Sequence, residues 1–310
     1  MKRFLVTGGA GFIGSHIVET LVRKGHFVRV LDNFSSGKKE NLAAVISKVD
    51  IVKGDIRLPG DCLKSARGMD YVMHEAALRS VPGSMKDPES YNEVNIGGTL
   101  NMLKASAACK VKRFVLASSS AIYGEAGRFP QKESFLPLLV SPYALSKLAG
   151  EYYCSIFSRF FGLETVSLRY FNVFGPRQAL DDEYAVVIPR FITCMLNDKE
   201  PPIYGTGKQS RDFVYIDNVV DANILAATKP GVKCGVFNVA SGRDYNLLEL
   251  IRILNRIMGG SLKPVLLDVR PGDVFKTLAD ISLAKKKLGF IPKVGIAQGL
   301  KATVEYFKNA

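Results

Sequence analysis

The first half of the chain alternates short apolar runs with stretches of helical periodicity, and this alternation most constrains the fold. Strands are predicted at Arg3–Thr7, Phe27–Asp32, Asp50–Lys53, Tyr71–His74, Arg113–Ala117 and Glu164–Tyr170. Helices are predicted at Phe12–Lys24, Asn95–Ala108 and Ser141–Phe161. Strands that alternate with helices form a parallel sheet covered on both faces. The pattern therefore predicts an α/β fold with a doubly wound parallel sheet of Rossmann type.

The alternation changes after Phe171. Two more strands are predicted at Phe213–Ile216 and Val236–Val239, and helices at Asn246–Met258 and Ile296–Phe307. We expect residues 1–171 to form the first domain and residues 172–310 most of a smaller C-terminal α/β domain. The strands near 213–239 are expected to return to the first domain. Because no low-complexity linker separates the two, they should pack closely.

The chain is basic, with 42 Lys and Arg against 29 Asp and Glu in 310 residues and a net charge of +13. An anionic ligand such as a nucleotide, or a nucleic acid, would suit this excess. The charges are scattered, however, and the densest run, Lys285–Lys287, is short. A basic solvated surface explains most of them, and no motif supports nucleic-acid binding.

Cysteines and histidines show no ligand spacing. The chain has five cysteines, far apart and without a C-x-x-C pair, and three histidines, His16, His26 and His74. A disulfide framework and a metal site are therefore not expected. The first apolar run breaks at Gly8, too early for a signal peptide, and no later run could span a membrane. We expect a cytoplasmic protein without membrane attachment.

A glycine-rich loop follows the first strand directly. The glycines fit G-x-G-x-x-G as Gly9, Gly11 and Gly14, or G-x-x-G-x-x-G as Gly8, Gly11 and Gly14. Either spacing lets the backbone approach a pyrophosphate at the N-terminus of the next helix. Asp32 ends the second strand about 20 residues further on, where a carboxylate accepts from both ribose hydroxyls of adenosine. A 2′-phosphate would be repelled there, so NAD is favoured over NADP.

Tyr143 and Lys147 lie four residues apart in a predicted helix and so share one face. Ser141 and Pro142 suit the start of that helix, as a hydroxyl N-cap followed by a first-turn proline. A nearby ammonium should lower the pKa of the phenol, which could then accept a proton from a substrate hydroxyl. Such a pair also occurs on solvated helix faces, so its weight depends on the rest of the chain.

With these features together, the chain resembles the extended short-chain dehydrogenase/reductase family, and within it the nucleotide-sugar epimerases of the UDP-glucose/UDP-N-acetylglucosamine 4-epimerase type. The likeness extends over essentially the whole length. The segments that carry it are Val6–His16, Leu31–Gly37, His74–Ala77, Asn95–Thr99, Ser118–Gly124, the Tyr143 and Lys147 pair, Leu168–Asn172, Arg211–Tyr215 and Arg270–Asp273.

The resemblance implies NAD as cofactor, bound by the domain of residues 1–171, and a nucleotide sugar bound mainly by residues 172–310. The implied cofactor contacts are Gly8, Gly11, Phe12, Ile13, Gly14, Asp32, Asn33, Ser35, Ser36, Gly37, Asp55, Ile56, Ala76, Ala77, Asn95, Ser118, Tyr143, Lys147, Tyr170 and Val173. Two alternatives stay open: Asp55 contacts the adenine amine or is an ordinary turn residue, and Asn95 supports the cofactor pocket or bonds only within its helix.

The resemblance also implies a mechanism. Tyr143 would be the base, and Lys147 would hold the nicotinamide ribose and lower the pKa of the tyrosine. Ser119, or Ser120 if the alignment shifts by one residue, would hydrogen-bond the reacting sugar hydroxyl; otherwise both serines are turn residues. Loss of the 4′-hydroxyl proton and a hydride would produce a 4-keto sugar, which would turn over and regain the hydride on its other face.

Substrate contacts are implied at Ser119, Ser120, Tyr143, Asn172, Arg211, Arg270, Asp273 and Thr277. The two arginines would bind the diphosphate with their planar donors, unless they form surface ion pairs. Asn172 would contact the sugar or phosphate, unless it only closes a turn, and Asp273 would contact the uridine ribose. Thr277 borders the C2 substituent in this family, and its small side chain leads us to expect N-acetylated UDP-hexoses alongside or instead of UDP-glucose and UDP-galactose. The run Val81–Pro88 resembles the same N-acetylhexosamine-active subgroup.

Several alternatives remain. Ser120 and Ala121 occupy the place of the Asp-Glu pair of the family's 4,6-dehydratases, which disfavours water elimination. Besides a 4-epimerase, the chain could perform uronate epimerisation, decarboxylation or reduction, or be a non-catalytic NAD sensor. Asp32 disfavours NADPH, the Tyr143 and Lys147 pair disfavours a sensor, and a uronate would need a further basic residue that the sequence does not identify. Apolar residues on several faces of the helices at 95–108 and 141–161 suit a homodimer or packing within one subunit.

Overall fold

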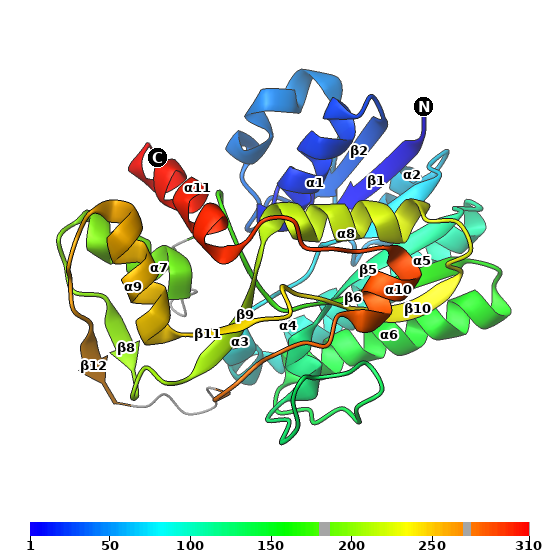
Figure 1. Cartoon of the computed structure of the whole chain (residues 1–310). Helices are drawn as coiled ribbons and strands as arrows, with labels where there is room; N and C mark the ends of the chain where they lie inside the picture. The colour runs from blue at the N-terminus through cyan, green and yellow to red at the C-terminus, as the bar shows by residue number, and fades with distance from the viewer. Residues whose placement is uncertain (180–186, 269–273, 310) are drawn as a thin grey trace.

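The computed structural model describes residues 1–179, 187–268 and 274–309. Its centre is a seven-stranded parallel sheet in the order β10-β6-β5-β4-β1-β2-β3 (Figure 1). The strands are β1 (Arg3–Thr7), β2 (Phe27–Asp32), β3 (Asp50–Lys53), β4 (Tyr71–His74), β5 (Arg113–Ser119), β6 (Glu164–Tyr170) and β10 (Cys234–Val239). This confirms the predicted Rossmann-type sheet. The strand order reverses between β1 and β4, which opens a crevice at the carboxyl ends of the strands.

Both faces of the sheet are covered. In β1, Phe4 and Val6 belong to one buried cluster and Leu5 to another, because successive side chains of a strand point to opposite faces. The first cluster includes residues of α1 (Phe12–Arg23), η1 (Lys39–Lys48) and α8 (Ile216–Thr228). The second includes residues of α2 (Pro59–Ala66), α5 (Thr99–Ala108) and α6 (Pro142–Phe160). Figure 1 shows α6 and α8 on either side of β5 and β6.

The helix α6 begins where the sequence predicts. The Ser141 hydroxyl accepts from the N–H of Ala144 at 3.1 Å, and Pro142 lies in the first turn. The helix expected over Asn95–Ala108 differs, because α5 is preceded by a π-helix, η2 (Asn92–Gly98). A π-turn is rare and tends to occur at functional sites. Apolar periodicity does not reveal this π-helix. Its residue Asn95 makes tertiary contacts, described below, that the sequence pattern does not contain.

The C-terminal region, at the left of Figure 1, contains two small sheets. One consists of β7 (Asn172–Phe174), β9 (Ser210–Tyr215) and β11 (Asp244–Asn246), the other of β8 (Pro202–Tyr204) and β12 (Val265–Leu267). Its helices are α7 (Val187–Leu196), α9 (Leu247–Met258) and α11 (Ile296–Lys308). The helix α10 (Ser282–Leu288) lies instead beside β10 of the main sheet and beside α8 (Figure 1).

The two later strands have different fates. Strand β10 joins the main sheet beside β6. The strand expected at Phe213–Ile216 does not return to it, which corrects that expectation, because β9 pairs with β7 instead, Asn172 lying opposite Phe213. The reason is local: β7 continues the chain just beyond the end of β6 and offers an edge there. The domain boundary at residue 171 stays a prediction.

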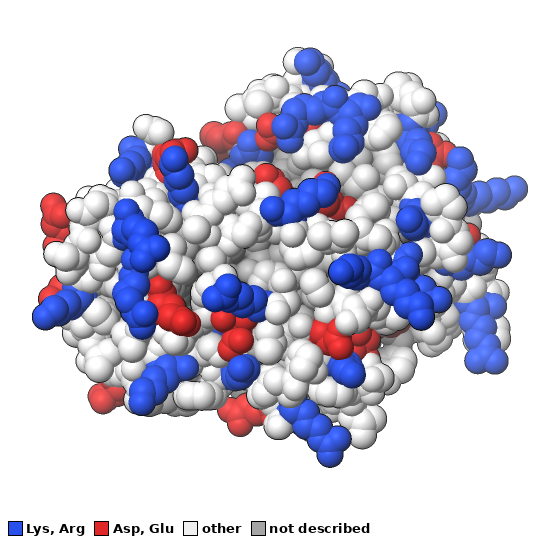
Figure 2. All heavy atoms as spheres, viewed as in Figure 1, with Lys and Arg blue, Asp and Glu red and all other residues white. Residues whose placement is uncertain are grey.

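The described surface is consistent with scattered charge. Figure 2 shows Lys and Arg spread over the visible face with Asp and Glu between them. Within the described residues, no helix is long and apolar enough to cross a membrane. The same part of the chain has no group of three His, Cys, Asp or Glu that could hold a metal ion, and its five cysteines are free.

Candidate active site

A cavity of about 1890 Å³ opens at the carboxyl ends of the parallel strands, between the main sheet and the C-terminal region. Its wall includes all the predicted cofactor residues except Asn95. It also includes the predicted substrate residues Ser119, Ser120, Tyr143, Asn172, Arg211 and Thr277. Arg270 and Asp273 lie outside the described residues. The fold thus gathers residues from across the sequence on one wall, while the role of each stays a prediction.

The glycine loop fits a pyrophosphate. Gly8 has φ +64°, and a Cβ on Gly14 would lie 2.1 Å from the carbonyl oxygen of Gly8. These positions therefore exclude side chains, which keeps the backbone open to the cavity. Gly11 is the N-cap residue of α1 and has no side chain, so it offers no acceptor to the first N–H groups of this helix. Such a helix start binds anions.

Asp32 is oriented for a ribose. Its Oδ2 accepts from the N–H of Ala10 at 2.9 Å and its Oδ1 accepts from the N–H of Phe34 at 2.8 Å. Each oxygen keeps a further lone pair, and the residue lines the cavity. The open glycine loop and this carboxylate fit the two ends of an adenosine diphosphate, so the site suits NAD.

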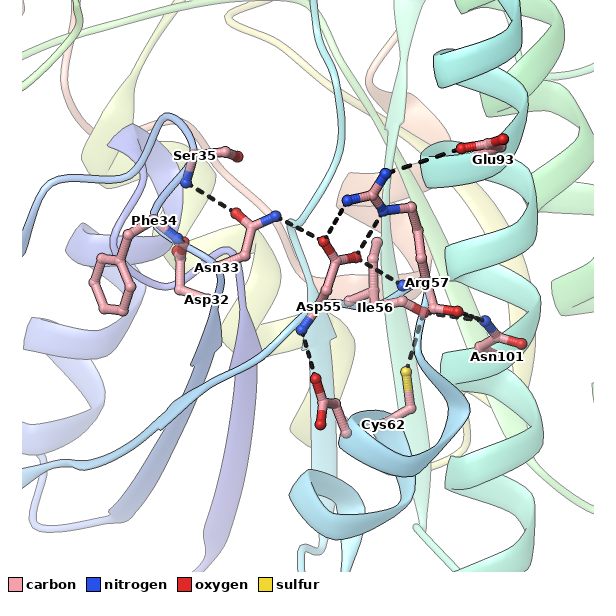
Figure 3. A network of polar contacts seen from close by, with 11 residues as sticks. Asp32, Asn33, Phe34, Ser35, Asp55, Ile56, Arg57, Cys62, Glu93 and Asn101 are labelled. Carbon is pink, nitrogen blue, oxygen red and sulfur yellow. Dashed lines mark hydrogen bonds and ion pairs between the residues drawn. The ribbon is translucent and has the colours of Figure 1, made fainter.

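Asp55 has a clear structural role. Figure 3 shows it between Asn33 and Arg57. The amide of Asn33 donates to it at 3.0 Å, and the guanidinium of Arg57 lies 2.8 Å from Oδ2. The backbone N–H of Arg57 donates to its Oδ1 at 2.9 Å, which closes a turn. Hydrogen bonds from Arg57 hold the pKa of Asp55 well below its usual range. The turn reading therefore accounts for its contacts, although Asp55 also lines the cavity.

Tyr143 and Lys147 share one face of α6, as predicted. Lys147 Nζ lies 5.8 Å from the centroid of the Tyr143 ring. The same ammonium donates to the carbonyl oxygen of Ala117 at 2.9 Å, and burial lowers the pKa of Lys147 to about 8. Tyr91, in α4 (Pro88–Tyr91), packs edge-on against Tyr143 with 6.3 Å between ring centroids.

The expected lowering of the Tyr143 pKa is wrong for the protein alone. Burial raises the pKa of Tyr143 above its usual value, against a hydrogen bond with Ser119 and the charge of Arg79, which lower it. Lys147 does not reverse this, because its ammonium lies beside the ring and bonds to the β5 backbone. The charge of Arg79 lowers the pKa of Tyr143, and the Lys147 ammonium lies 5.8 Å from the centroid of its ring.

The serines at the end of β5 and after it make different hydrogen bonds. Ser118 donates to Glu151 at 2.5 Å, and Glu151 is paired with Arg169 at 2.7 Å. Ser119 accepts from the N–H of Ala121 at 3.1 Å and thereby caps η3 (Ser120–Tyr123). Both Ser119 and Ser120 line the cavity, but the pKa of Tyr143 responds to Ser119. Ser119 is therefore the better placed of the two to act with the phenol.

Asn95 supports the cavity from behind. Its Oδ1 accepts from the N–H of Leu78 at 2.8 Å, and its Nδ2 donates to the carbonyl oxygen of Leu78 at 2.9 Å and to Ser146 Oγ at 3.0 Å. These bonds join η2, the segment after β4 and α6. Because these hydrogen bonds extend beyond the helix of Asn95, the alternative that Asn95 bonds only within its own helix is wrong.

On the substrate side, Asn172 and Thr277 are linked. The Nδ2 of Asn172 donates to the carbonyl oxygen of Asp212 at 3.2 Å and to Thr277 Oγ1 at 3.1 Å. The N–H of Asp212 donates to the same Thr277 oxygen at 3.2 Å. The Asp212 carboxylate is fully buried and accepts from Ser241 at 2.7 Å and from the N–H of Ala279 at 3.2 Å, which holds the segment of Thr277 in place.

Sequence reasoning missed several charged residues of the cavity, among them one acid and one base close to Tyr143 and Lys147. Glu75 and Arg79 both follow β4 and line the cavity. Arg79 follows Leu78, whose backbone is held by Asn95. The sequence feature that could have identified them is their position directly after a central strand, at the switch point of the sheet, where ligands bind. The whole arrangement sets a phenol, a buried ammonium and a serine hydroxyl beside a dinucleotide site, which suits proton removal from a hydroxyl next to a hydride acceptor.

Comparison with known proteins agrees with this chemistry. The model of the NAD dependent epimerase/dehydratase family matches residues 4–240. A UDP-glucose 4-epimerase of Mycolicibacterium smegmatis is 36% identical over 313 residues, covering 99% of this chain and 99% of its own.

Two solved structures are similar over nearly the full length. The UDP-N-acetylglucosamine 4-epimerase from Methanobrevibacter ruminantium M1, in complex with UDP-N-acetylmuramic acid, has a TM-score of 0.95 and 43% identity, covering 99% of this chain and 98% of its own. The UDP-glucose 4-epimerase from Thermotoga maritima, with UDP-glucose, has a TM-score of 0.94 and 42% identity, covering 99% of each chain.

Proposed function

The chain belongs to the NAD-dependent epimerase/dehydratase family and modifies nucleotide sugars, and we propose that it is a UDP-hexose 4-epimerase whose substrates include UDP-N-acetylglucosamine and UDP-N-acetylgalactosamine. UDP-glucose and UDP-galactose are the other pair of substrates. The solved relatives support both pairs, since one acts on an acetylated sugar and another on UDP-glucose.

The proposed chemistry uses the residues at the end of the cavity. The glycine loop and Asp32 would hold NAD, which would supply a reversible hydride acceptor beside the sugar. Tyr143 takes the proton of the 4′-hydroxyl and gives one back, and Ser119 hydrogen-bonds the reacting oxygen. Because burial raises the pKa of Tyr143, the phenolate depends on positive charge nearby, which Arg79 and Lys147 supply. Arg211 lines the cavity and serves the diphosphate.

Acetylated sugars are supported by one polar arrangement, and it carries the proposal. The carbonyl of Asp212 can only accept, so the amide hydrogens of Asn172 are spent on it and on Thr277. Within the described residues, the Asn172 carbonyl oxygen has no partner. The Thr277 oxygen accepts two hydrogen bonds, which leaves its proton free to be donated. One acceptor beside one donor complements the N–H and C=O of an acetamido group.

Arg79 favours a second candidate, the 4-epimerisation of a UDP-uronate. A sugar carboxylate needs a cation near the distal end of the site, and Arg79 lines the cavity close enough to Tyr143 to act on its pKa. Water elimination stays disfavoured, because Ser120 and Ala121 supply no carboxyl group in η3.

The proposed assembly is a homodimer joined through α6. Its outer face exposes Leu145, Tyr152, Ile156 and Phe160, which are between 44% and 68% exposed. Their spacing places them along one side of the helix. A second copy of this face would cover such an apolar stripe and form an isologous interface.

One assay tests the proposed function. The purified protein is incubated separately with UDP-glucose, UDP-N-acetylglucosamine and UDP-glucuronate, with and without added NAD, and the products are separated by chromatography. Conversion of the acetylated gluco sugar to its galacto epimer supports the proposal, and conversion of the uronate alone supports the second candidate. A 4-keto product or release of CO2 as the main outcome contradicts both.

A further inference from the structure

Glu75 is an acidic residue of the cavity that the proposed mechanism does not use. It follows His74 at the end of β4, and His74 lies opposite Leu116 of β5, so Glu75 comes next to Ala117. The carbonyl oxygen of Ala117 is the acceptor for the Lys147 ammonium at 2.9 Å. Both Glu75 and Lys147 line the cavity. The Glu75 carboxylate, after β4, and the Lys147 ammonium, from α6, thus lie at the same end of the site, near the end of β5.

Two buried side chains aim this carboxylate. The hydroxyl of Tyr170 donates to Glu75 Oε1 at 2.9 Å. The Nδ2 of Asn223, in α8, donates to the Tyr170 oxygen at 2.7 Å and to the carbonyl oxygen of Val219 at 2.9 Å. Asn223 is fully buried and Tyr170 is 7% exposed. The Oδ1 of Asn223 lies 3.0 Å from the same Tyr170 hydroxyl and is a second acceptor for its proton, so the amide of Asn223 and the carboxylate of Glu75 together orient the phenol.

Other ionisable groups around Lys147 do not balance its charge. His74, on β4, is held by Thr7 and Thr99, and burial lowers its pKa to about 3, so it is neutral. Tyr143, on α6, and Tyr170, on β6, have raised pKa values and are neutral phenols. Glu151, one turn further along α6, is paired with Arg169. Within the described residues, this leaves Glu75 as the carboxylate that can serve the ammonium.

We propose that Glu75 is a positioning residue for the epimerisation, whose carboxylate, aimed by Tyr170 and Asn223, keeps the Lys147 ammonium charged at the end of the cavity where Tyr143 acts. The inference rests on the proposed function for its catalytic consequence, but the charge pairing itself does not. A buried ammonium without a counter-charge loses its proton at lower pH, and it then ceases to favour the phenolate. The mutual influence agrees. Burial raises the pKa of Glu75 to about 7, against the hydrogen bond from Tyr170 and the charge of Lys147, so Glu75 is a carboxylate above neutral pH. Burial lowers the pKa of Lys147 to about 8, against the charge of Glu75.

The first experiment measures Lys147 directly, in the protein without added substrate. Lysines are labelled competitively with acetic anhydride across a pH series, and mass spectrometry gives the protonation midpoint of Lys147. The change Glu75→Gln keeps the shape and the acceptor for Tyr170 but removes the charge. We expect the midpoint to fall by about one pH unit, a tenfold change in the proton affinity of the ammonium.

The matched control is Glu151→Gln, which removes a buried carboxylate close to Lys147 whose charge Arg169 already balances. It should lower the thermal midpoint of unfolding and leave the protonation midpoint of Lys147 unchanged. An equal shift in both variants would mean that Glu75 acts only through the general packing of the cavity, and would overturn the proposal. If Glu75→Gln does not fold by circular dichroism, Glu75→Leu removes the same charge without a polar group to bury.

The second experiment follows kcat for a UDP-hexose from about pH 6 to about pH 9.5. In Glu75→Gln, kcat should stay within about twofold of wild type at the acidic end and fall about tenfold on the basic limb, which moves to lower pH. A uniform loss at every pH would indicate a structural role and contradict the inference. If Lys147 shifts while neither protein turns over any UDP-hexose, the proposed function fails and the pairing stands.

Discussion

The side-chain amide of Asn172 donates to the hydroxyl of Thr277 at 3.1 Å, across 105 positions of the sequence. Since Asp212 donates to the same hydroxyl, the Thr277 oxygen is saturated as an acceptor and keeps only its proton for a ligand. Thr277 therefore has two separable properties, its small size and its hydroxyl proton. Only the first could be considered from the sequence.

These two properties predict different variants. Thr277→Tyr should abolish turnover of N-acetylated UDP-hexoses and spare UDP-glucose, because the phenol fills the space for the C2 substituent. Thr277→Val keeps the size and loses the donor, so kcat/KM for the acetylated sugars should fall about tenfold, as for one lost hydrogen bond. Thr277→Ser is the control and should remain near wild type. Parallel changes on both sugar classes in kcat/KM assays would exclude a gating role.

Tyr143→Phe removes the proposed base without changing the shape of the cavity. We expect kcat to fall by about 10²–10⁴-fold, the usual contribution of a positioned acid or base, with KM changed little. NAD binding, measured by fluorescence titration, should be retained, since the glycine loop and Asp32 are untouched. Turnover close to wild type would show that another group removes the proton.

Gly14→Ala tests the cofactor loop. The new Cβ would lie 2.1 Å from the Gly8 carbonyl oxygen and 2.8 Å from Gly9 Cα, so the loop must move. We expect NAD affinity to fall at least about tenfold, because the backbone N–H groups lose their geometry. Gly60→Ala, in α2 with no atom within 4 Å of its Cβ and no positive φ, is the control for stability. NAD affinity is measured by calorimetry, and equal affinities of Gly14→Ala and wild type would contradict this prediction.

Burial of neutral His74 should make the free energy of unfolding depend on pH below about 6.5. His74 is 2% exposed, and burial lowers its pKa to about 3 from an unfolded value near 6.5. Below the unfolded pKa, His74 binds a proton in the denatured chain but not in the native protein. The contribution of this residue to stability therefore falls by about 1.4 kcal/mol for each pH unit of acidification. His74→Gln should lose about 2 kcal/mol less than wild type between pH 6.5 and pH 5 in urea titrations. Parallel pH profiles would refute a buried neutral imidazole.

Ile156→Glu tests the α6 face. Ile156 is 44% exposed in the single chain, and a charge there should prevent a second copy from packing on the apolar stripe. Light scattering after size exclusion should show a dimer for wild type and a monomer for the variant. The control is Leu136→Glu, at an 85% exposed position outside the stripe. A wild-type monomer, or a variant that remains dimeric, argues against this interface.

Local patterns were sufficient for most of the sheet. The bounds predicted for β1, β2, β3, β4 and β6 coincide with those observed, because each is a short apolar run between turn residues. The start of α6 followed from Ser141 and Pro142 for the same local reason. Strand β9 was placed in the wrong sheet, since its partner β7 is chosen by where the chain lies after β6 and not by the composition of β9.

The candidate site shows the same limit. The glycine spacing, Asp32 and the Tyr143 and Lys147 pair could be predicted, because each depends on a few neighbouring residues or on a resemblance in order. The raised pKa of Tyr143 could not, since burial and the charge of Arg79 act on it through space. Glu75 went unnoticed for the same reason, as its partners Tyr170 and Asn223 come from β6 and α8.

By itself, the sequence determined the alternation of strands and helices, the phosphate-binding loop and the family, because these are properties of segments and of their order. The tertiary structure alone decided which hydroxyl, carboxylate and ammonium meet in the cavity and which charge acts on which proton. Electrostatic and hydrogen-bond energies depend on distance and burial, and residues such as Asn172 and Thr277 acquire both only when the chain has folded.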